Sequence, residues 1–127
     1  MLIEDNPADV MLVREALRWS PIPADVIIAY DGEQALKILD EFGLKSDFII
    51  LDLSIPKFDG HAILERIKSS QGPPIVVFTS SSNSEDRRRA FENGASDYVI
   101  KPASFKAFMS AVQGIVERWA KPAGSAG

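Results

Sequence analysis

The chain contains no cysteine, which excludes both a disulfide framework and a thiolate metal site. No apolar run approaches the roughly 18 residues that a membrane-spanning helix requires, and no signal peptide is visible. The formal net charge of −4 offers no general attraction for nucleic acid or for an anionic membrane. We therefore expect a cytoplasmic protein that binds neither nucleic acid nor membrane.

Histidine is almost absent, since His61 is the only one in the chain. Its place near the start of a predicted helix favours a surface position over a phosphotransfer role. The basic run Arg87 to Arg89 is interpreted as a solvated helix face, because the chain has no basic domain that would bind nucleic acid.

Short apolar runs alternate with longer segments of helical periodicity, which indicates repeated βα units around a parallel sheet buried on both faces. A chain of 127 residues is long enough for one such domain. We assign residues 1–120 to it and predict that the tail 121–127, which has little apolar content, is disordered. The predicted strands cover residues 1–3, 26–29, 48–51, 75–78 and 98–100.

Capping residues mark the helices between these strands. Asn6 followed by proline predicts a helix start, and Asp31 with Gln34 and Ser82 with Glu85 each resemble a capping box. Asn93-Gly94 fits a left-handed C-terminal cap. The last helix carries the clearest apolar stripe, formed by Phe105, Phe108, Met109, Val112, Ile115, Val116 and Trp119.

Three carboxylates, a hydroxyl and a lysine lie at the ends of four separate apolar runs. They are Glu4 and Asp5, Asp52, Thr79 and Lys101. The carboxyl ends of parallel strands share one edge of the sheet, where open α/β sheets bind ligands. Crowded acids repel one another unless a cation intervenes, and Mg²⁺ prefers oxygen ligands. This combination predicts a divalent metal beside a phosphoryl group.

A carboxylate can also act as a nucleophile toward phosphorus and form an aspartyl phosphate. Asp52 is the predicted nucleophile because it lies on the central strand. Such chemistry needs charge neutralisation on the transferred oxygens, which Lys101 and the metal could supply, and Thr79 could donate a hydrogen bond to one of these oxygens.

In order and spacing, these residues resemble the response-regulator receiver domains of two-component signalling, over nearly the whole chain. The motifs that carry the resemblance are Ile3 to Asn6, Asp52 to Pro56 with Asp59-Gly60, Phe78 to Ser80, Gly94 to Tyr98, and Lys101-Pro102. The family fold is a flavodoxin-like, doubly wound, five-stranded parallel sheet in the order 2-1-3-4-5 with five helices.

The resemblance implies that Asp52 accepts a phosphoryl group from the phosphohistidine of a sensor histidine kinase. It implies that Asp5, Asp52 and the backbone carbonyl of Ser54 bind Mg²⁺ directly, and that Glu4 acts through water. Glu4 replaces the commoner aspartate, which a role through water tolerates.

The resemblance also implies a switch. Thr79 would turn toward the phosphoryl group and Tyr98 would swing inward behind it, while the Lys101-Pro102 bond would be cis. Ser54 and Ser81 stand at positions similar to those that tune the lifetime of the phosphate. The protein would catalyse only its own phosphorylation and dephosphorylation, so it would be a signalling switch rather than an enzyme.

Single-domain regulators partnered with bacterial phytochromes share the paired phenylalanines and the tryptophan of the last helix, so a phytochrome is a candidate kinase. The output surface would be the fourth helix, the fifth strand and the fifth helix. Without an attached effector, output would pass through an unknown partner protein or a homodimer. Family members usually have a longer lead into strand one, which predicts missing residues before Met1.

Three alternatives use the same features. A Mg²⁺-dependent phosphatase with an aspartate nucleophile would need a second acid where Ser54 stands. A flavodoxin-like FMN binder would be repelled by Glu4-Asp5. A constitutive interaction module would have no need for the clustered acids.

Overall fold

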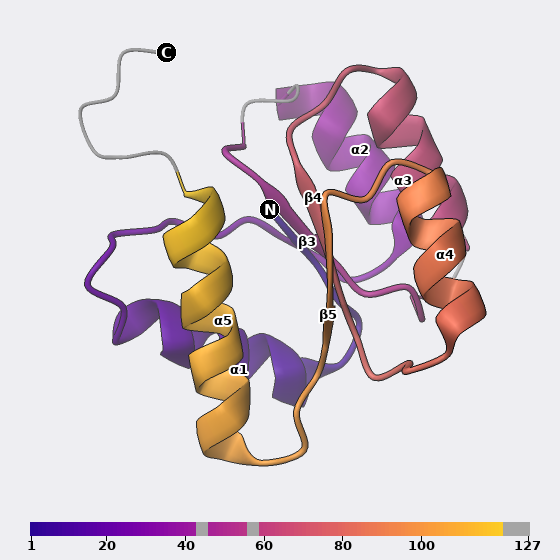
Figure 1. Cartoon of the computed structure of the whole chain (residues 1–127). Helices are drawn as coiled ribbons and strands as arrows, with labels where there is room; N and C mark the ends of the chain where they lie inside the picture. Colours follow the sequence, from indigo (N-terminus) through magenta and orange to yellow (C-terminus); the bar gives the residue numbers. More distant parts are fainter. Residues whose placement is uncertain (43–45, 56–58, 121–127) are drawn as a thin grey trace.

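Five short parallel strands form one sheet at the centre of the molecule (Figure 1). The computed structural model describes residues 1–42, 46–55 and 59–120. Within them the strands are β1 (Leu2–Ile3), β2 (Ile28–Ala29), β3 (Ile49–Leu51), β4 (Ile75–Thr79) and β5 (Asp97–Ile100). Their order across the sheet is β2-β1-β3-β4-β5. The predicted flavodoxin-like α/β topology is confirmed.

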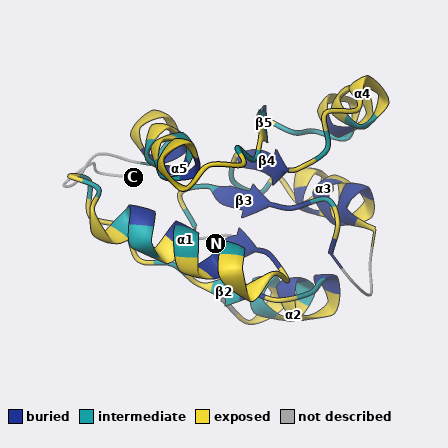
Figure 2. Ribbon diagram, turned by 90° about the horizontal axis from the view of Figure 1, so that it is seen from below, coloured by how far each residue is buried: buried dark blue, intermediate teal, exposed yellow. Residues whose placement is uncertain are grey.

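Helices cover both faces of this sheet. They are α1 (Pro7–Arg18), α2 (Gly32–Phe42), α3 (Gly60–Ser69), α4 (Ser84–Glu92) and α5 (Phe105–Trp119). Figure 1 shows α1 and α5 together on one face, and α2, α3 and α4 on the other. Seen from below, the buried strands lie between these two helical layers (Figure 2).

Successive residues of a strand point to opposite faces, so each strand contributes to two cores. Ile75 and Val77 of β4 pack in the core under α2, α3 and α4, whereas Val76 and Phe78 pack under α1 and α5. The second core includes an edge-to-face contact between Phe78 and Phe108, whose ring centroids are 5.1 Å apart. Burial on both faces explains why the strands read as uninterrupted apolar runs.

Most predicted helix boundaries are confirmed. The side chain of Asn6 caps α1, and Gly94, which follows the C-cap Asn93 of α4, has a positive φ of 109°. The backbone N–H of Gln34 donates to Asp31, although the Gln34 side chain accepts from the N–H of Tyr30. The predicted Ser82 cap is wrong by one residue, because Asn83 caps α4. Asn83 is the cap because its side-chain carbonyl oxygen accepts a hydrogen bond from the N–H of Glu85 at 2.7 Å.

Other predicted features differ from the structure in their details. The first three strands are shorter than the apolar runs, since β1 begins at Leu2, β2 covers only Ile28–Ala29 and β3 begins after Phe48. The strands β4 and β5 are each longer than predicted by one residue. Phe105 leads the apolar stripe of α5 yet is 61% exposed, because it lies in the first turn. The tail 121–127 and Pro56 lie outside the described residues. Among the described helices, none combines the length and the apolar character needed to cross a membrane.

Candidate functional site

The hydrogen-bond ladder of the sheet continues for one residue beyond three strand ends. The backbone N–H of Glu4 donates to Ala29 at 2.9 Å, and that of Asp52 donates to Ile3 at 3.0 Å. On the other side of the sheet, the N–H of Lys101 donates to Thr79 at 2.7 Å. These bonds fix the backbones of the residues that carry the polar side chains, so the site stands on the sheet itself.

The Lys101 ammonium group joins three carboxylates. Its Nζ lies 2.8 Å from Glu4 Oε2, 2.8 Å from Asp9 Oδ2 and 3.0 Å from Asp52 Oδ2. The side chain of Lys101 is 7% exposed, so these charge-assisted bonds form away from most of the solvent. The residues that directly follow β1, β3 and β5 thereby meet a residue of α1 at one point.

Asp9 is the member of this cluster that sequence reasoning did not identify. It lies in the first turn of α1, where an acidic residue is explained by the helix dipole alone. The signal that could have revealed it is the turn between β1 and α1, which is short enough to return the start of α1 to the sheet edge.

The surroundings of Glu4 favour its protonated form. Burial raises the pKa of this carboxyl to about 7, and the charge of Asp52 acts in the same direction. The hydrogen bond from Lys101 opposes the shift without cancelling it. For Lys101 itself, burial lowers the pKa, but the bonds to Asp9, Glu4 and Asp52 together outweigh burial and raise it. Lys101 therefore stays cationic.

Glu4, Asp5 and Asp52 form a group that could hold a metal ion. One oxygen from each carboxylate lies within 4.8 Å of the others. Asp5 is exposed, whereas Glu4 and Asp52 are buried. This donor set consists of oxygen atoms alone and is open to solvent on one side, so it fits a hard divalent cation that keeps several waters.

Ser54 and Thr79 flank Asp52. The N–H of Ser54 donates to Asp52 Oδ1 at 3.1 Å, so this loop folds back on the carboxylate. Thr79 is 1% exposed at the end of the adjacent strand, and its hydroxyl accepts a long bond of 3.4 Å from the N–H of Ser81. Both residues thus lie at the predicted edge.

Tyr98 already faces inward in this structure. Its ring is 5% exposed, and its hydroxyl donates to the carbonyl of Ser81 at 2.9 Å. The guanidinium carbon of Arg87 lies 5.8 Å from the ring centroid. The loop after β4 therefore connects Tyr98 to Thr79 through a single residue, Ser81.

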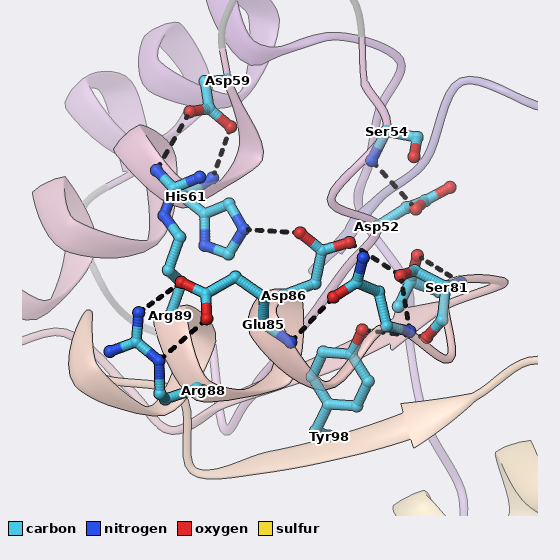
Figure 3. A network of polar contacts seen from close by, with 12 residues as sticks. Asp52, Ser54, Asp59, His61, Ser81, Glu85, Asp86, Arg88, Arg89 and Tyr98 are labelled. Carbon is cyan, nitrogen blue, oxygen red and sulfur yellow. Dashed lines mark hydrogen bonds and ion pairs between the residues drawn. The ribbon is translucent and has the colours of Figure 1, made fainter.

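The prediction that His61 lies on the surface is wrong. His61 is 5% exposed, because the first turn of α3 faces α4 (Figure 3). Neither ring nitrogen has a hydrogen-bond partner among the described residues. The helical pattern located His61 near the start of α3 but could not show that another helix covers it.

The prediction of a cis Lys101-Pro102 bond is also wrong for this structure, in which the described residues contain no cis peptide bond. The trans form before proline is intrinsically favoured by about 0.5–1 kcal/mol, so a cis bond requires contacts that reverse this preference.

The basic run on α4 consists of paired residues. Arg88 forms ion pairs with Glu85 and Glu92 on its own helix, and the Arg89 guanidinium lies 3.7 Å from the carboxylate of Asp59, the N-cap of α3. Arg87 lies over the rings of Phe91 and Tyr98. Most of these groups are exposed, as a solvated helix face requires.

Comparison with known proteins decides the family. The model of the response regulator receiver domain matches residues 1–113. The chain belongs to this family. Receiver domains are the phosphorylation-activated switches of two-component signalling and work with sensor histidine kinases.

Two curated relatives match the chain over most of their own length. The probable methanogenesis regulatory protein FilR2 of Methanothrix harundinacea is 38% identical, with 94% of this chain and 81% of the relative covered. The response regulator Rcp1 of Synechocystis sp. is 36% identical, with 94% of this chain and 86% of the relative covered.

Solved structures agree with this receiver domain in fold and in subgroup. The phosphorylated cyanobacterial phytochrome response regulator RcpA superposes with a TM-score of 0.85 at 36% identity, covering 93% of this chain and 90% of that one. The Mn²⁺-bound form of Rcp1 gives 0.85 at 34% identity, with 99% and 96% covered. The bacteriophytochrome response regulator AtBRR gives 0.70 at 33% identity, with 96% and 94% covered. The predicted similarity to phytochrome-associated regulators is confirmed.

Proposed function

We propose that Asp52 accepts a phosphoryl group from the phosphohistidine of a sensor histidine kinase in a Mg²⁺-dependent reaction. A carboxylate oxygen of Asp52 attacks phosphorus, the bond from phosphorus to the donor nitrogen breaks, and an aspartyl phosphate forms. The observation that carries this proposal is the convergence of Asp52 with Glu4, Asp5 and Lys101 at one sheet edge.

Asp5, Asp52 and the backbone carbonyl of Ser54 would hold Mg²⁺, with Glu4 acting through water. The ion, when bound, supplies positive charge that offsets the negative charge of the phosphoryl oxygens. The partly exposed, all-oxygen donor set of the three acids supports this assignment.

The remaining residues act on the transferred group and on the loop beside it. Lys101 supplies a fixed positive charge next to Asp52 Oδ2. The Thr79 hydroxyl would leave its long bond with the Ser81 N–H and donate to a phosphoryl oxygen. Because the Tyr98 hydroxyl is bonded to the Ser81 carbonyl, Tyr98 would move together with Ser81. Thr79 and Tyr98 would thus both be parts of the switch.

The kinase partner that we propose is a bacterial phytochrome. The support is the similarity to RcpA, a cyanobacterial phytochrome response regulator, and to AtBRR, a bacteriophytochrome response regulator. We further propose that the protein acts in the cytoplasm, where such kinases present their phosphohistidine.

The output surface that we propose consists of α4, β5 and α5. Phe91, Ile100 and Phe105, one from each of these elements or its boundary, are 41%, 46% and 61% exposed. Large exposed apolar side chains suit a protein partner or a second copy of this chain.

The test is phosphorylation by acetyl phosphate with Mg²⁺, read as the mass of one added phosphoryl group. Wild type is expected to be labelled, and Asp52→Asn is expected to remain unlabelled, because an amide is not a nucleophile toward phosphorus. Replacing Mg²⁺ with EDTA should also prevent labelling. Full labelling of Asp52→Asn would remove Asp52 from the mechanism.

A phosphatase remains the second candidate because it uses the same nucleophile and the same metal. The residue two positions after Asp52 is Ser54, which cannot protonate a leaving group as an acid would. Steady turnover of small phosphate esters by the purified protein would favour the phosphatase over the switch.

A further inference from the structure

The buried imidazole of His61 is the strongest polar feature that the proposed reaction does not use. Its Nε2 lies 3.8 Å from Asp86 Oδ1, across the contact between α3 and α4 (Figure 3). This separation is longer than a hydrogen bond, which is about 2.9 Å for nitrogen and oxygen. Buried polar groups normally have hydrogen-bond partners. A second conformation of the protein can therefore provide His61 with the partner that it lacks here.

Asp86 is held by a different partner in this structure. Its Oδ2 accepts a 2.7 Å bond from the hydroxyl of Ser81, in the loop that joins β4 to α4. The same hydroxyl accepts the N–H of Asn83, the N-cap of α4, at 3.2 Å. The Asp86 carboxylate therefore lies between the loop on one side and His61 on the other, as Figure 3 shows.

Ser81 connects this carboxylate to the residues of the proposed switch. Its N–H donates to the Thr79 hydroxyl, and its carbonyl accepts from the Tyr98 hydroxyl. When Thr79 turns toward a phosphoryl group, the bond from Ser81 is lost and the loop is freer to move. The same event weakens the hold of Ser81 on Asp86.

We propose that Ser81 and His61 are alternative partners of the Asp86 carboxylate, so that the contact between α3 and α4 is part of the phosphorylation switch. This inference rests on the proposed function. In the unphosphorylated protein Ser81 holds Asp86 and His61 stays unpartnered. In the phosphorylated protein a movement of about 1 Å closes the gap between His61 Nε2 and Asp86 Oδ1.

Competition for the Asp86 carboxylate predicts opposite effects for substitutions of Ser81 and of His61. Ser81→Ala removes the partner of the unphosphorylated state, whereas His61→Leu removes the partner of the phosphorylated state. A ligand that binds one conformation has an apparent affinity proportional to the population of that conformation. The two substitutions should therefore shift the affinity for a phosphoryl analogue in opposite directions.

The experiment measures binding of beryllofluoride with Mg²⁺ to the full chain by calorimetry. Ser81→Ala is expected to bind at least about fivefold more tightly than wild type, and His61→Leu at least about fivefold more weakly, as for other linked sites. His61→Gln keeps an N–H donor and should bind as wild type does. Glu85→Gln is the matched control, because Glu85 lies on α4 and pairs with Arg88 of the same helix.

The double variant Ser81→Ala/His61→Leu separates competition from a local effect. If Ser81 acts only at the phosphoryl group, its substitution changes affinity equally in both backgrounds. If it competes with His61 for Asp86, the gain from Ser81→Ala disappears when His61 is leucine. Equal gains in both backgrounds would overturn the inference.

Two further results have a defined meaning. If the wild-type protein does not bind beryllofluoride, both the proposed function and this inference are overturned. Normal binding by wild type, with Ser81→Ala and His61→Leu both unchanged, would overturn this inference alone. If His61→Leu does not fold, a Ser81→Ala protein that binds no more tightly than Glu85→Gln also overturns it.

Discussion

At the scale of single residues, Glu4 is the side chain whose charge the fold most opposes. The carboxyl is 2% exposed, and burial raises its pKa from 4.5 to about 7. The folded protein therefore holds the Glu4 proton more tightly than the unfolded chain does. Between about pH 4.5 and 7, the free energy of unfolding should fall as pH rises, by at most about 3 kcal/mol.

Substitution by glutamine tests this assignment in metal-free buffer. Glu4→Gln should increase the free energy of unfolding at pH 8 by about 1–3 kcal/mol, because the amide carries no charge to bury. The difference from wild type should shrink as the pH falls through 7 and approach zero below about pH 4, where Glu4 is protonated in both states. Urea unfolding at several pH values with EDTA measures it. A constant difference at every pH would show that the charge of Glu4 is not the cause.

His61 is the second residue with an energetic consequence. Its two buried ring nitrogens have no hydrogen-bond partner within the described part of the chain, which costs about 1–3 kcal/mol each by comparison with satisfied groups. The unphosphorylated His61→Leu protein should therefore melt at the same temperature as wild type or a higher one. The same variant is expected to bind beryllofluoride more weakly. If His61 had only a structural role, an unchanged or higher melting temperature would not be accompanied by weaker binding.

At the scale of elements, the start of α3 is packed directly against the loop after β3. A Cβ atom added to Gly60 would lie 2.6 Å from both the Cα and the carbonyl oxygen of Leu53. Leu53 separates Asp52 from Ser54, so any displacement of this backbone moves the proposed phosphoacceptor and a proposed metal ligand together. Glycine is required here because no side chain fits between the helix and the loop.

The expected effect of Gly60→Ala is a loss of about 1–3 kcal/mol of stability, since the clash is with backbone atoms that cannot rotate away. Weaker Mg²⁺ binding should accompany it. Gly114→Ala is the matched control, because nothing lies within 4 Å of its added Cβ on α5. That substitution should stabilise the protein by up to about 1 kcal/mol. Thermal melts with and without MgCl₂ measure both variants, and equal behaviour would contradict the packing argument.

Helix starts illustrate how much of an element can be predicted. Asn6 was identifiable because proline and an acid follow it. At α4, Ser82 and Asn83 are both good caps, and local sequence does not separate them. In the folded loop the Ser81 hydroxyl accepts a hydrogen bond from the N–H of Asn83 and donates one to Asp86. These contacts favour Asn83 as the cap.

At the scale of the whole molecule, metal binding and folding should be linked. The acids that would hold Mg²⁺ come from two strands that meet only in the folded sheet. Free Mg²⁺ at ten times its dissociation constant should therefore raise the free energy of unfolding by about 1.4 kcal/mol. For a domain of this size the melting temperature should rise by about 5 °C.

Asp5→Asn should abolish this rise, whereas Glu117→Gln, which changes an exposed acid on α5, should preserve it. Differential scanning fluorimetry over a MgCl₂ series gives both curves. An undiminished rise in Asp5→Asn would show that the ion binds elsewhere on the molecule.

Local sequence patterns were sufficient to predict the elements, their order and the edge of the sheet at which the polar residues lie. Periodicity and capping are local properties, and the ends of parallel strands share one edge in any sheet of this kind. Three further relations became visible in the folded chain: Asp9 pairs with Lys101, α4 covers His61, and Ser81 and His61 lie on either side of Asp86. These relations depend on distances between side chains of different elements, which packing sets and no local pattern contains.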